Sequence, residues 1–529
     1  MKTLSDTLEA WRPGISSDWM AQLAAPQISE VGRITRIADG IIELTGLPSI
    51  RPDELLAFPG DIMGFAKTLD PDVVGCVMLD PPSALNPGDL VRSTGRTVSV
   101  PVGDALLGRV IDPLGRPHDG KPPIQTRERS AIEQPAPDVM HRNLIKDPLE
   151  TGITIVDAMF AIGRGQRELI IGDRSSGKTA LAVDTIINQR NTEVICVYVS
   201  IGQKLSDIRS VIDTVHTHGM TDRTVIVASQ SSAPPGLQWI APYAGFAIAE
   251  YFRDKGKHVL IVLDDLTKHA AVHREISLLL RQPPGREAYP GDIFHIHARM
   301  LERAAQLLPE DGGGSLTALP IAETQAGNLS AYIPTNLISI TDGQIYLDSK
   351  LFSSGIKPAV DVGRSVSRVG GKAQKPGLRA VAAGLRLDYA QFLELEVFTR
   401  FGAVVDPHTK AIIEHGRRIR GTLAQGRHAP LSMSAQVALL LALNEGLLDT
   451  CTPADVETFK SQLVDWLHQH AADDLAEIAA KGALSDANRD ALIRAMTTLS
   501  RQITGQPSDT APRARVFLIL RRDGKTSLI

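Results

Sequence analysis

The sequence has few cysteines and no long apolar run. Its 529 residues include three cysteines, Cys76, Cys196 and Cys451, which lie far apart and show no C-x-x-C spacing. Neither a disulfide framework nor a zinc site is indicated, and a reducing compartment fits this pattern. No apolar stretch approaches the ~20 residues that span a bilayer. We therefore expect any membrane association to come through partner proteins.

The sequence also lacks a strong charge of either sign and a targeting segment. The formal net charge is −4, which excludes a strong basic field that would attract nucleic acid. The first residues contain no apolar core of a secretory signal, and their early acidic side chains are not typical of a transit peptide. We expect neither kind of leader.

The composition is that of a folded chain, with 43% hydrophobic and 22% charged residues, and the length predicts about three domains. Residues 28–97 contain short apolar runs between glycine and proline turns, which predict a small β-barrel. Residues 98–375 alternate strand and helix patterns, which predict a mainly parallel sheet covered by helices. Residues 376–504 show apolar stripes at helical spacing, so a helical bundle is expected.

Two terminal segments flank these domains. Residues 1–27 form an N-terminal segment, whose first twelve residues predict one short helix before Pro13 and Gly14. Residues 505–529 form a tail that begins like a linker. Five apolar residues between basic pairs in Arg513–Arg522 predict a pairing strand or, as the alternative, a frayed end that touches lipid.

The strongest motif runs from Gly172 to Thr179 and matches G-x-x-x-x-G-K-[ST] at every fixed position, with an apolar strand before it and a helical pattern after it. In such a loop, backbone N–H groups and the helix N-terminus bind phosphate. Lys178 would add a mobile cation, and the Thr179 hydroxyl would be a Mg²⁺ ligand. We expect a nucleoside phosphate to be bound by the whole loop, Gly172, Asp173, Arg174, Ser175, Ser176, Gly177, Lys178 and Thr179.

A second apolar run ends in the acidic pair Asp264 and Asp265. A carboxylate at the C-terminal end of a strand lies at the crevice where such sheets bind ligands, and it can hold Mg²⁺ beside a phosphate-binding loop. Asp264 is the preferred metal ligand because it directly ends the run. Asp265 could cap the next helix, and the alternative is that the two roles are reversed, with Asp265 as the metal ligand.

Hydrolysis also requires a group that accepts a proton from the attacking water, usually a carboxylate after the strand beside the loop strand. At that place stands Gln203, whose amide can orient water but cannot take a proton at neutral pH. Asp207, one helical turn further on, is the nearest substitute. The sequence therefore predicts a site that holds a nucleotide without cleaving it efficiently.

An arginine in a Ser/Gly-rich loop, Arg368 within Ser365–Gly371, can reach out and neutralise charge on a transferring phosphoryl group. Taken alone, such an arginine is more often a surface or salt-bridge residue.

Long strings of this sequence together resemble the alpha subunit of the F-type rotary ATP synthase. The likeness covers about residues 28 to 450 and includes Leu107–Arg116, Ile162–Gly172, Tyr251–Asp254, Pro283–Asp292 and Ser365–Gly371. The resemblance implies an N-terminal β-barrel, a central RecA-like P-loop domain and a C-terminal helical bundle, placed in a ring of alternating alpha and beta subunits.

The resemblance also implies functions. The alpha site would hold ATP or ADP with Mg²⁺, while Arg368, together with Ser365, would act in trans on the catalytic beta site. Residues 283–292 would contact the gamma-type central stalk, and delta- and b-type subunits would form the peripheral stalk. A membrane sector would move ions, with the complex on the cytoplasmic face of the inner (plasma) membrane. No nucleic acid is implied.

Five positions resemble the adenine pocket of alpha, namely Phe352, Lys357, Pro358, Gln425 and Arg427. The chain departs from the family pattern at Ser175, Leu205, Lys357 and Arg427, and its N-terminal helix is short. These departures suggest a divergent alpha subunit of a second, accessory synthase.

Three other functions remain open from the residues. A catalytic ATPase of a secretion-type motor should carry glutamate at position 203. A hexameric nucleic-acid translocase needs basic or aromatic channel loops, for which Arg417–Arg420 is the best local candidate. A regulatory nucleotide-binding scaffold without a motor role is the third.

Overall fold

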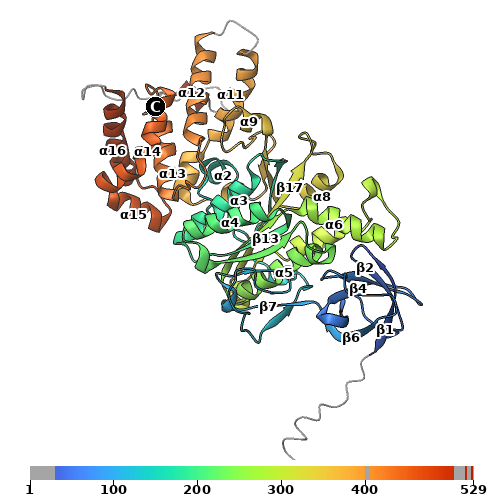
Figure 1. Ribbon diagram of the computed structural model, residues 1–529. Coiled ribbons are helices and arrows are strands. Elements are labelled where there is room, and N and C mark those ends of the chain that lie inside the picture. Colours follow the sequence, from blue (N-terminus) through green and yellow to red (C-terminus); the bar gives the residue numbers. More distant parts are fainter. Residues whose placement is uncertain (1–29, 400–405, 506–518, 521–525, 528–529) are drawn as a thin grey trace, which may run out of the picture. The chain divides into compact units, whose positions relative to one another are not determined.

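The computed structural model describes residues 30–399, 406–505, 519–520 and 526–527 (Figure 1). Two compact units can be distinguished. Of the described residues, 30–98, 234–237 and 278–282 form one unit, and the other described residues form the second. The first unit is a β-barrel, and the second contains both a large sheet and the helical domain.

The barrel unit closes six strands in the order β1-β2-β5-β4-β3-β6. The strands are β1 (Val31–Ala38), β2 (Ile41–Thr45), β3 (Glu54–Ala57), β4 (Met63–Leu69), β5 (Val74–Met78) and β6 (Leu90–Thr97). Ile42, Leu44, Leu56 and Val91 belong to its buried apolar core. Closure leaves no unpaired strand edge. The predicted small β-barrel is confirmed.

A nine-stranded sheet forms the centre of the second unit. Its order is β19 (Val366–Ser367), β18 (Gly343–Leu347), β12 (Glu168–Asp173), β17 (Ser315–Thr324), β15 (His258–Asp264), β13 (Ile195–Gln203), β14 (Thr224–Gln230) and β8 (Val110–Ile111), with β16 (Ala305–Gln306) beside β17. All neighbours are parallel except the β18–β19 and β16–β17 pairs. The predicted, mainly parallel sheet is confirmed.

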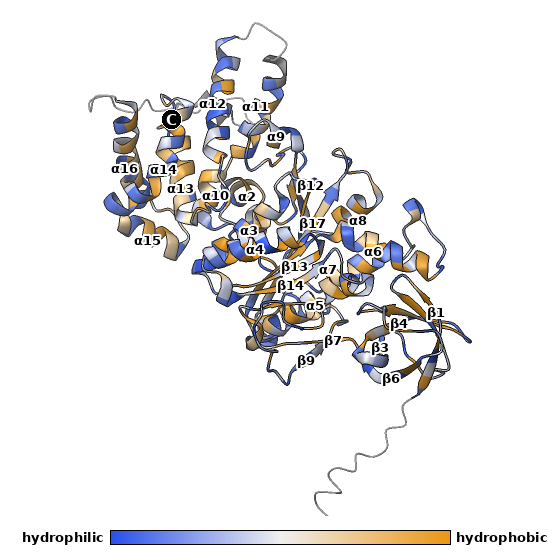
Figure 2. Cartoon of the chain, viewed as in Figure 1, coloured by the Kyte–Doolittle hydropathy of each residue, from blue (hydrophilic) through white to orange (hydrophobic). Residues whose placement is uncertain are grey.

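The central strands of this sheet are mostly apolar and buried because helices cover them, as Figure 2 shows for β13 and α5. The helices that follow the strands are α2 (Thr154–Met159), α3 (Lys178–Asn188), α4 (Leu205–Thr217), α5 (Pro235–Asp254), α6 (Leu266–Leu279), α7 (Ile293–Leu301), α8 (Tyr332–Ile340) and α9 (Ser349–Ser353). In the ladder between β13 and β15, Ser200 pairs with Asp264. This register brings Asp264 and Gln203 to the same edge of the sheet as the loop after β12.

The chain after Pro376 is helical, as predicted. Its helices are α10 (Pro376–Ala382), α11 (Leu385–Thr399), α12 (Pro407–Leu423), α13 (Met433–Asn444), α14 (Pro453–His470), α15 (Ala472–Lys481) and α16 (Asp486–Thr504). The predicted start of α14 is confirmed, because Thr452 and Asp455 form a reciprocal capping box and Pro453 is the first helical residue. Helices α11 and α12 pack closely at Gly416, which has no side chain. A Cβ at this position would lie 2.0 Å from the ring of Phe392.

The predictions for the termini have different outcomes. The short helix expected at the N-terminus lies outside the described residues. In the tail, Ile519–Leu520 (β20) pairs antiparallel with Thr526–Ser527 (β21), so part of the predicted strand pairs within the tail itself. Among the described residues, no helix combines the length and the apolar character needed to cross a membrane.

A buried ion pair links two segments that cover the sheet. Arg303 is 1% exposed, and its Nε donates to Glu250 Oε1 on α5 at 2.8 Å while its Nη1 donates to the Ile132 carbonyl at 2.8 Å. Removing one partner of such a pair leaves a buried charge without compensation, which costs about 3–5 kcal/mol.

Arg303→Met is therefore expected to lower the Tm of the full chain by several degrees in a thermal unfolding scan. The control is Arg209→Met, because Arg209 is exposed and pairs with the exposed Asp213 on α4. Loss of an exposed pair of that kind costs less than about 1 kcal/mol. Equal Tm values for the two variants would contradict the assigned role of Arg303.

Candidate nucleotide-binding site

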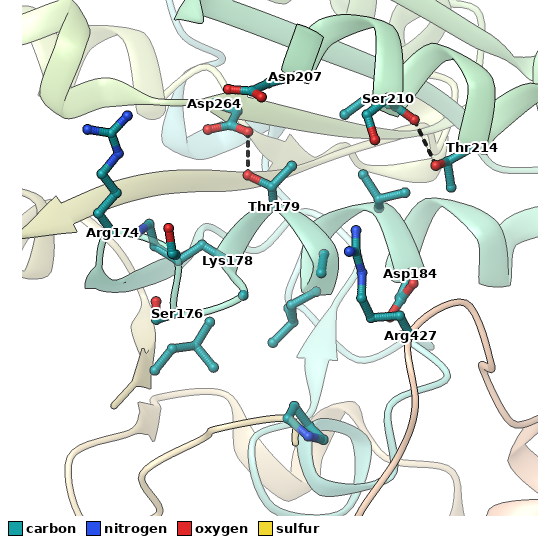
Figure 3. Close-up of a pocket in the computed structure, with 18 of the residues that line it drawn as sticks. Arg174, Ser176, Lys178, Thr179, Asp184, Asp207, Ser210, Thr214, Asp264 and Arg427 are labelled. Atoms are coloured by element: carbon teal, nitrogen blue, oxygen red, sulfur yellow. Dashed lines mark hydrogen bonds between the residues drawn. The ribbon is translucent and has the colours of Figure 1, made fainter. Parts of the chain in front are cut away.

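A cavity of about 640 Å³ opens at the carboxyl ends of β12, β13 and β15, where the sequence places the phosphate-binding loop. Figure 3 shows Lys178, Thr179 and Asp264 toward one end of this cavity and Asp184 and Arg427 toward the other. The cavity is lined both by the loop and by the residues expected to surround a base. Ligands of open α/β sheets bind at this edge.

The loop between β12 and α3 is shaped by its backbone. Gly177 has φ +101°, a left-handed conformation that suits glycine, and a Cβ on Gly172 would lie 2.3 Å from the Leu347 carbonyl oxygen. Ser175 also has a positive φ, +62°. This curl, followed directly by the first N–H groups of α3, presents backbone donors that have no acceptor within the helix. The Ser176 hydroxyl is buried and has no partner among the described residues, as expected of a group that a bound phosphate would satisfy.

Two side chains stabilise the loop from within. Asp173 accepts hydrogen bonds from Thr324 Oγ1 at 2.6 Å and from Gly327 N at 2.8 Å. Burial alone would raise the pKa of Asp173, but these hydrogen bonds outweigh it and the pKa lies below its usual value. Lys178 is 6% exposed, and its Nζ donates to the carbonyl oxygens of Gly172 at 3.0 Å and Asp173 at 2.7 Å. The Lys178 ammonium is therefore already held at the loop, and its burial lowers its pKa.

Asp264 is a buried carboxylate with three donors. Thr179 Oγ1, Tyr198 OH and Gln203 Nε2 each donate to it at 2.8 Å. Burial raises the pKa of Asp264, and the hydrogen bonds from Thr179 and Tyr198 act in the opposite direction. The arrangement joins the first turn of α3 to the ends of β13 and β15 through one side chain.

The pair of Thr179 and Asp264 fits a Mg²⁺ ion that also takes phosphate oxygens from a nucleotide. No group of three or more acidic, histidine or cysteine side chains among the described residues could hold a metal alone. Mg²⁺ is usually bound through one or two carboxylates together with substrate phosphates, so this donor set is sufficient. Asp265 instead accepts from Lys268 N at 2.8 Å and caps α6, and burial raises its pKa to about 7.

Gln203 lies between an anion and a cation. Its Nε2 donates to Asp264 Oδ1 at 2.8 Å, and its Oε1 accepts from Lys268 Nζ at 2.5 Å. Both ends of the amide are thus engaged within the chain. The sequence did not predict that Lys268 and Tyr198 belong to the site. A lysine in the first turn of a helix is common at the surface, and a tyrosine in a buried strand is common in a core. The cavity also contains the carboxylates of Asp207, which is exposed, and Glu323 at the end of β17.

The residues expected around the base do line the cavity. Phe352, Lys357, Pro358, Gln425 and Arg427 all belong to its wall. Lys357 Nζ lies 5.1 Å from the centroid of the Phe352 ring. Gln425 is engaged elsewhere, since its Nε2 donates to the carbonyl oxygens of Gly152 and Ala429, each at 2.7 Å, and its Oε1 accepts from Thr154 N at 3.0 Å. Gln425 therefore shapes the wall through bonds within the chain.

Arg368 and Ser365 do not belong to this cavity. Arg368 directly follows β19 at the sheet edge, is exposed, and its side chain forms no hydrogen bond or ion pair within the parts of the chain that the structure describes. Its backbone N donates to the Asp342 carbonyl at 2.9 Å. The Ser365 hydroxyl is buried, donates to the Asp361 carbonyl at 2.6 Å and accepts from Tyr346 N at 3.0 Å. Ser365 thus fixes the loop that presents Arg368.

The buried ammonium of Lys178 predicts a simple binding result. Lys178→Ala should weaken binding of a Mg²⁺-nucleoside triphosphate to the full chain by at least about tenfold in a calorimetric titration, because a charge-assisted hydrogen bond contributes ~1.5–3 kcal/mol. Lys372→Ala serves as the control, since Lys372 lies outside the cavity wall. Equal affinities for Lys178→Ala and wild type would contradict a phosphate site in this loop.

Comparison with known proteins agrees with this geometry. The family model for the nucleotide-binding domain of the ATP synthase alpha/beta family matches residues 152–367, and the model for the C-terminal domain of the ATP synthase alpha/beta chain matches residues 374–499. ATP synthase subunit alpha 3 of Paraburkholderia xenovorans (strain LB400) is 56% identical over 482 residues, which cover 91% of each chain. ATP synthase subunit alpha 2 of Gluconobacter oxydans (strain 621H) is 52% identical over 489 residues, which cover 92% of this chain and 96% of the relative. The chain therefore belongs to the ATP synthase alpha/beta family, and these relatives within the family are alpha subunits.

Proposed function

We propose that this chain is a non-catalytic alpha subunit, which holds ATP or ADP with Mg²⁺ in the head of a rotary, ion-translocating ATP synthase. The observation that carries the proposal is the bonding of Gln203, which lies between Asp264 and Lys268 where a catalytic site needs a proton acceptor. A neutral amide cannot accept a proton from water at neutral pH. The site has the parts for binding, and at the position expected for the proton acceptor it has an amide.

The chemistry of binding follows from the same residues. The loop donors and Lys178 bind the phosphates, while Thr179 and Asp264 would hold Mg²⁺. When bound, Mg²⁺ neutralises phosphate charge and fixes the position of the phosphates. Each end of the Gln203 amide already makes one bond within the chain, which leaves one hydrogen and one lone pair for orienting a water molecule but no group that accepts its proton. Asp264 is committed to three donors and cannot serve as a base without losing them.

We infer that Arg368 is an arginine finger for a neighbouring beta-type catalytic site. It is exposed and lies outside the cavity of its own chain, and among the described residues its side chain forms no hydrogen bond or salt bridge, although it attracts the buried carboxylate of Glu168. Arginine suits this role because its planar guanidinium donates to two phosphate oxygens at once. Ser365 supports the role by fixing the loop from inside. This arrangement fits a ring in which alpha and beta subunits alternate and ATP synthesis is driven by an ion gradient.

The remaining partners are proposed from the family. Residues 283–292 would contact a gamma-type central stalk, and the exposed Arg286 and Glu287 lie in this segment. Delta- and b-type subunits would form the peripheral stalk, and a membrane sector would place the complex at the cytoplasmic face of the inner membrane. The relatives are numbered alpha 2 and alpha 3, which fits an additional synthase copy.

The alternative functions are less well supported by the structure. For a nucleic-acid translocase, the candidate arginines of α12 should be available, but Arg418 pairs with Asp449 at 3.2 Å and Arg420 with Glu396 at 2.6 Å, which leaves Arg417 as the exposed one. A secretion-type motor would need a carboxylate in place of Gln203. A scaffold without a motor role would fail to assemble with a catalytic partner.

The test of the arginine finger uses the assembled complex. Arg368→Ala should leave nucleotide binding by this chain and assembly of the complex intact, while ATP turnover falls about 10³-fold or more. Arg368→Lys should recover only part of the loss, because an ammonium does not reproduce the planar fork of the guanidinium.

The matched control is Arg364→Ala, which removes an exposed arginine from the same loop. It is expected to keep most of the turnover. If Arg368→Ala turned over ATP at the wild-type rate, the arginine would have no part in the mechanism, and the proposal of a contribution in trans would be withdrawn.

A further inference from the structure

The buried acid Glu168 lies in the same row of the sheet as the residue that precedes Arg368. Glu168 is the first residue of β12 and is 0% exposed. It pairs with Gly343 on β18, and Gly343 pairs with Ser367 on β19, so the three residues form one row across three strands. Arg368 directly follows Ser367. The row therefore runs from a buried carboxyl group to the base of the loop that carries the proposed arginine finger.

The glycine in the middle of this row gives the carboxyl group its space. A Cβ added to Gly343 would lie 2.6 Å from Glu168 Oε2 and 2.8 Å from Glu168 Oε1. Both carboxyl oxygens thus lie against the Gly343 backbone, in a place that any side chain at this position would occupy. The side chain of Glu168 therefore leans from β12 across β18, in the direction of β19.

Gln166 joins the carboxyl group to Ser367. Its Nε2 donates to Glu168 Oε2 at 2.7 Å and to Ser367 Oγ at 3.3 Å, and its Oε1 accepts from Gly163 N at 2.7 Å. Gln166 is fully buried, and these bonds use both of its amide hydrogens. Without the acceptor at Glu168, one buried amide hydrogen would lose its partner, and the amide would no longer be held against Ser367.

Ser367 in turn fixes the backbone around Arg368. Its Oγ accepts from Gly370 N at 3.1 Å and donates to the Ala161 carbonyl at 3.1 Å. The bond between Ser367 and Gly370 closes a turn that contains Arg368. This anchor is separate from that of Ser365, whose hydroxyl bonds to the Asp361 carbonyl and to Tyr346 N.

The surroundings of Glu168 favour its uncharged form. Burial raises the pKa of Glu168 well above its ordinary value, and the charge of Asp342 adds to this effect, whereas the hydrogen bond from Gln166 and the charge of Arg368 lower the pKa. The Oε1 atom is buried and has no hydrogen-bond partner among the described residues, so a negative charge there would lack compensation. The role of this side chain is therefore that of a hydrogen-bond acceptor, which an amide of the same length can also fill.

We propose that Glu168 is a positioning residue for Arg368, which acts through Gln166 and Ser367 to hold the arginine finger in the orientation that a neighbouring catalytic site requires. The inference rests on the function proposed for Arg368. Glu168 itself is buried and does not contact the phosphoryl group. It opens β12, whereas the phosphate-binding loop follows the other end of this strand, so nucleotide binding by the chain itself does not depend on Glu168.

The experiment measures ATP turnover by the assembled complex with Glu168→Leu, Glu168→Gln, Arg368→Ala, or the first and last changes together. Glu168→Leu removes the acceptor and should lower turnover at saturating ATP by about tenfold to 100-fold, because a misplacement of ~1 Å causes losses of this order. Glu168→Gln keeps a carbonyl acceptor at the same place and should retain most of the turnover. The double variant should be no slower than Arg368→Ala alone, because residues that act as one unit are not additive.

Two further measurements separate this role from a general structural one. Glu168→Leu should leave nucleotide binding by the full chain and assembly of the complex unchanged. If Glu168→Leu does not assemble, Glu168→Asp takes its place in every comparison, since it keeps an acid but withdraws it from Gln166 by one methylene group.

The inference is overturned if Glu168→Leu keeps the wild-type turnover, if it weakens nucleotide binding by the chain itself, or if Glu168→Gln loses as much turnover as Glu168→Leu. It is also overturned if Glu168→Leu slows the Arg368→Ala complex by the same factor as the wild-type complex. If Arg368→Ala turns over ATP at the wild-type rate, the arginine finger is wrong and this inference fails with it. A defect in Arg368→Ala without one in Glu168→Leu refutes only the positioning by Glu168.

Discussion

The hydrogen bonds around the Asp264 carboxylate are the interaction on which the site depends. Thr179, Tyr198 and Gln203 each donate to this buried side chain, and Lys268 extends the network through the Gln203 amide. A buried carboxylate is tolerated only when it is fully paired, so these bonds fix the relative positions of α3, β13 and β15. The parallel register of the sheet supplies the scaffold that brings their ends together.

The same network explains why we propose that this chain binds a nucleotide without hydrolysing it. Binding groups face the cavity, whereas the amide that replaces a proton acceptor is held between opposite charges and cannot change its role. Arg368, the proposed arginine finger, lies outside this cavity and is exposed, in a loop that the buried Ser365 anchors. One chain would thus hold a nucleotide for structural or regulatory purposes and contribute to chemistry at a neighbouring site.

Local sequence patterns were sufficient for the fold and for the phosphate end of the site. The loop from Gly172 to Thr179 follows from turn and helix chemistry within a few residues, and Asp264 follows from its place at the end of an apolar strand. Tyr198 and Lys268 could not be predicted, because their roles arise only when the sheet register and the first turns of α6 bring them to Asp264 and Gln203. The saturated amide of Gln425 likewise depends on Gly152, far away in the sequence.

The most direct test of whether this chain binds ATP without hydrolysing it is to follow the chemical state of the bound nucleotide. The purified full chain is loaded with Mg²⁺ and ATP labelled at the γ-phosphate, separated from unbound nucleotide, and quenched at intervals. The account predicts that the bound label remains in ATP over hours. Release of labelled phosphate within seconds, together with loss of that release in Asp207→Asn or Glu323→Gln, would contradict it.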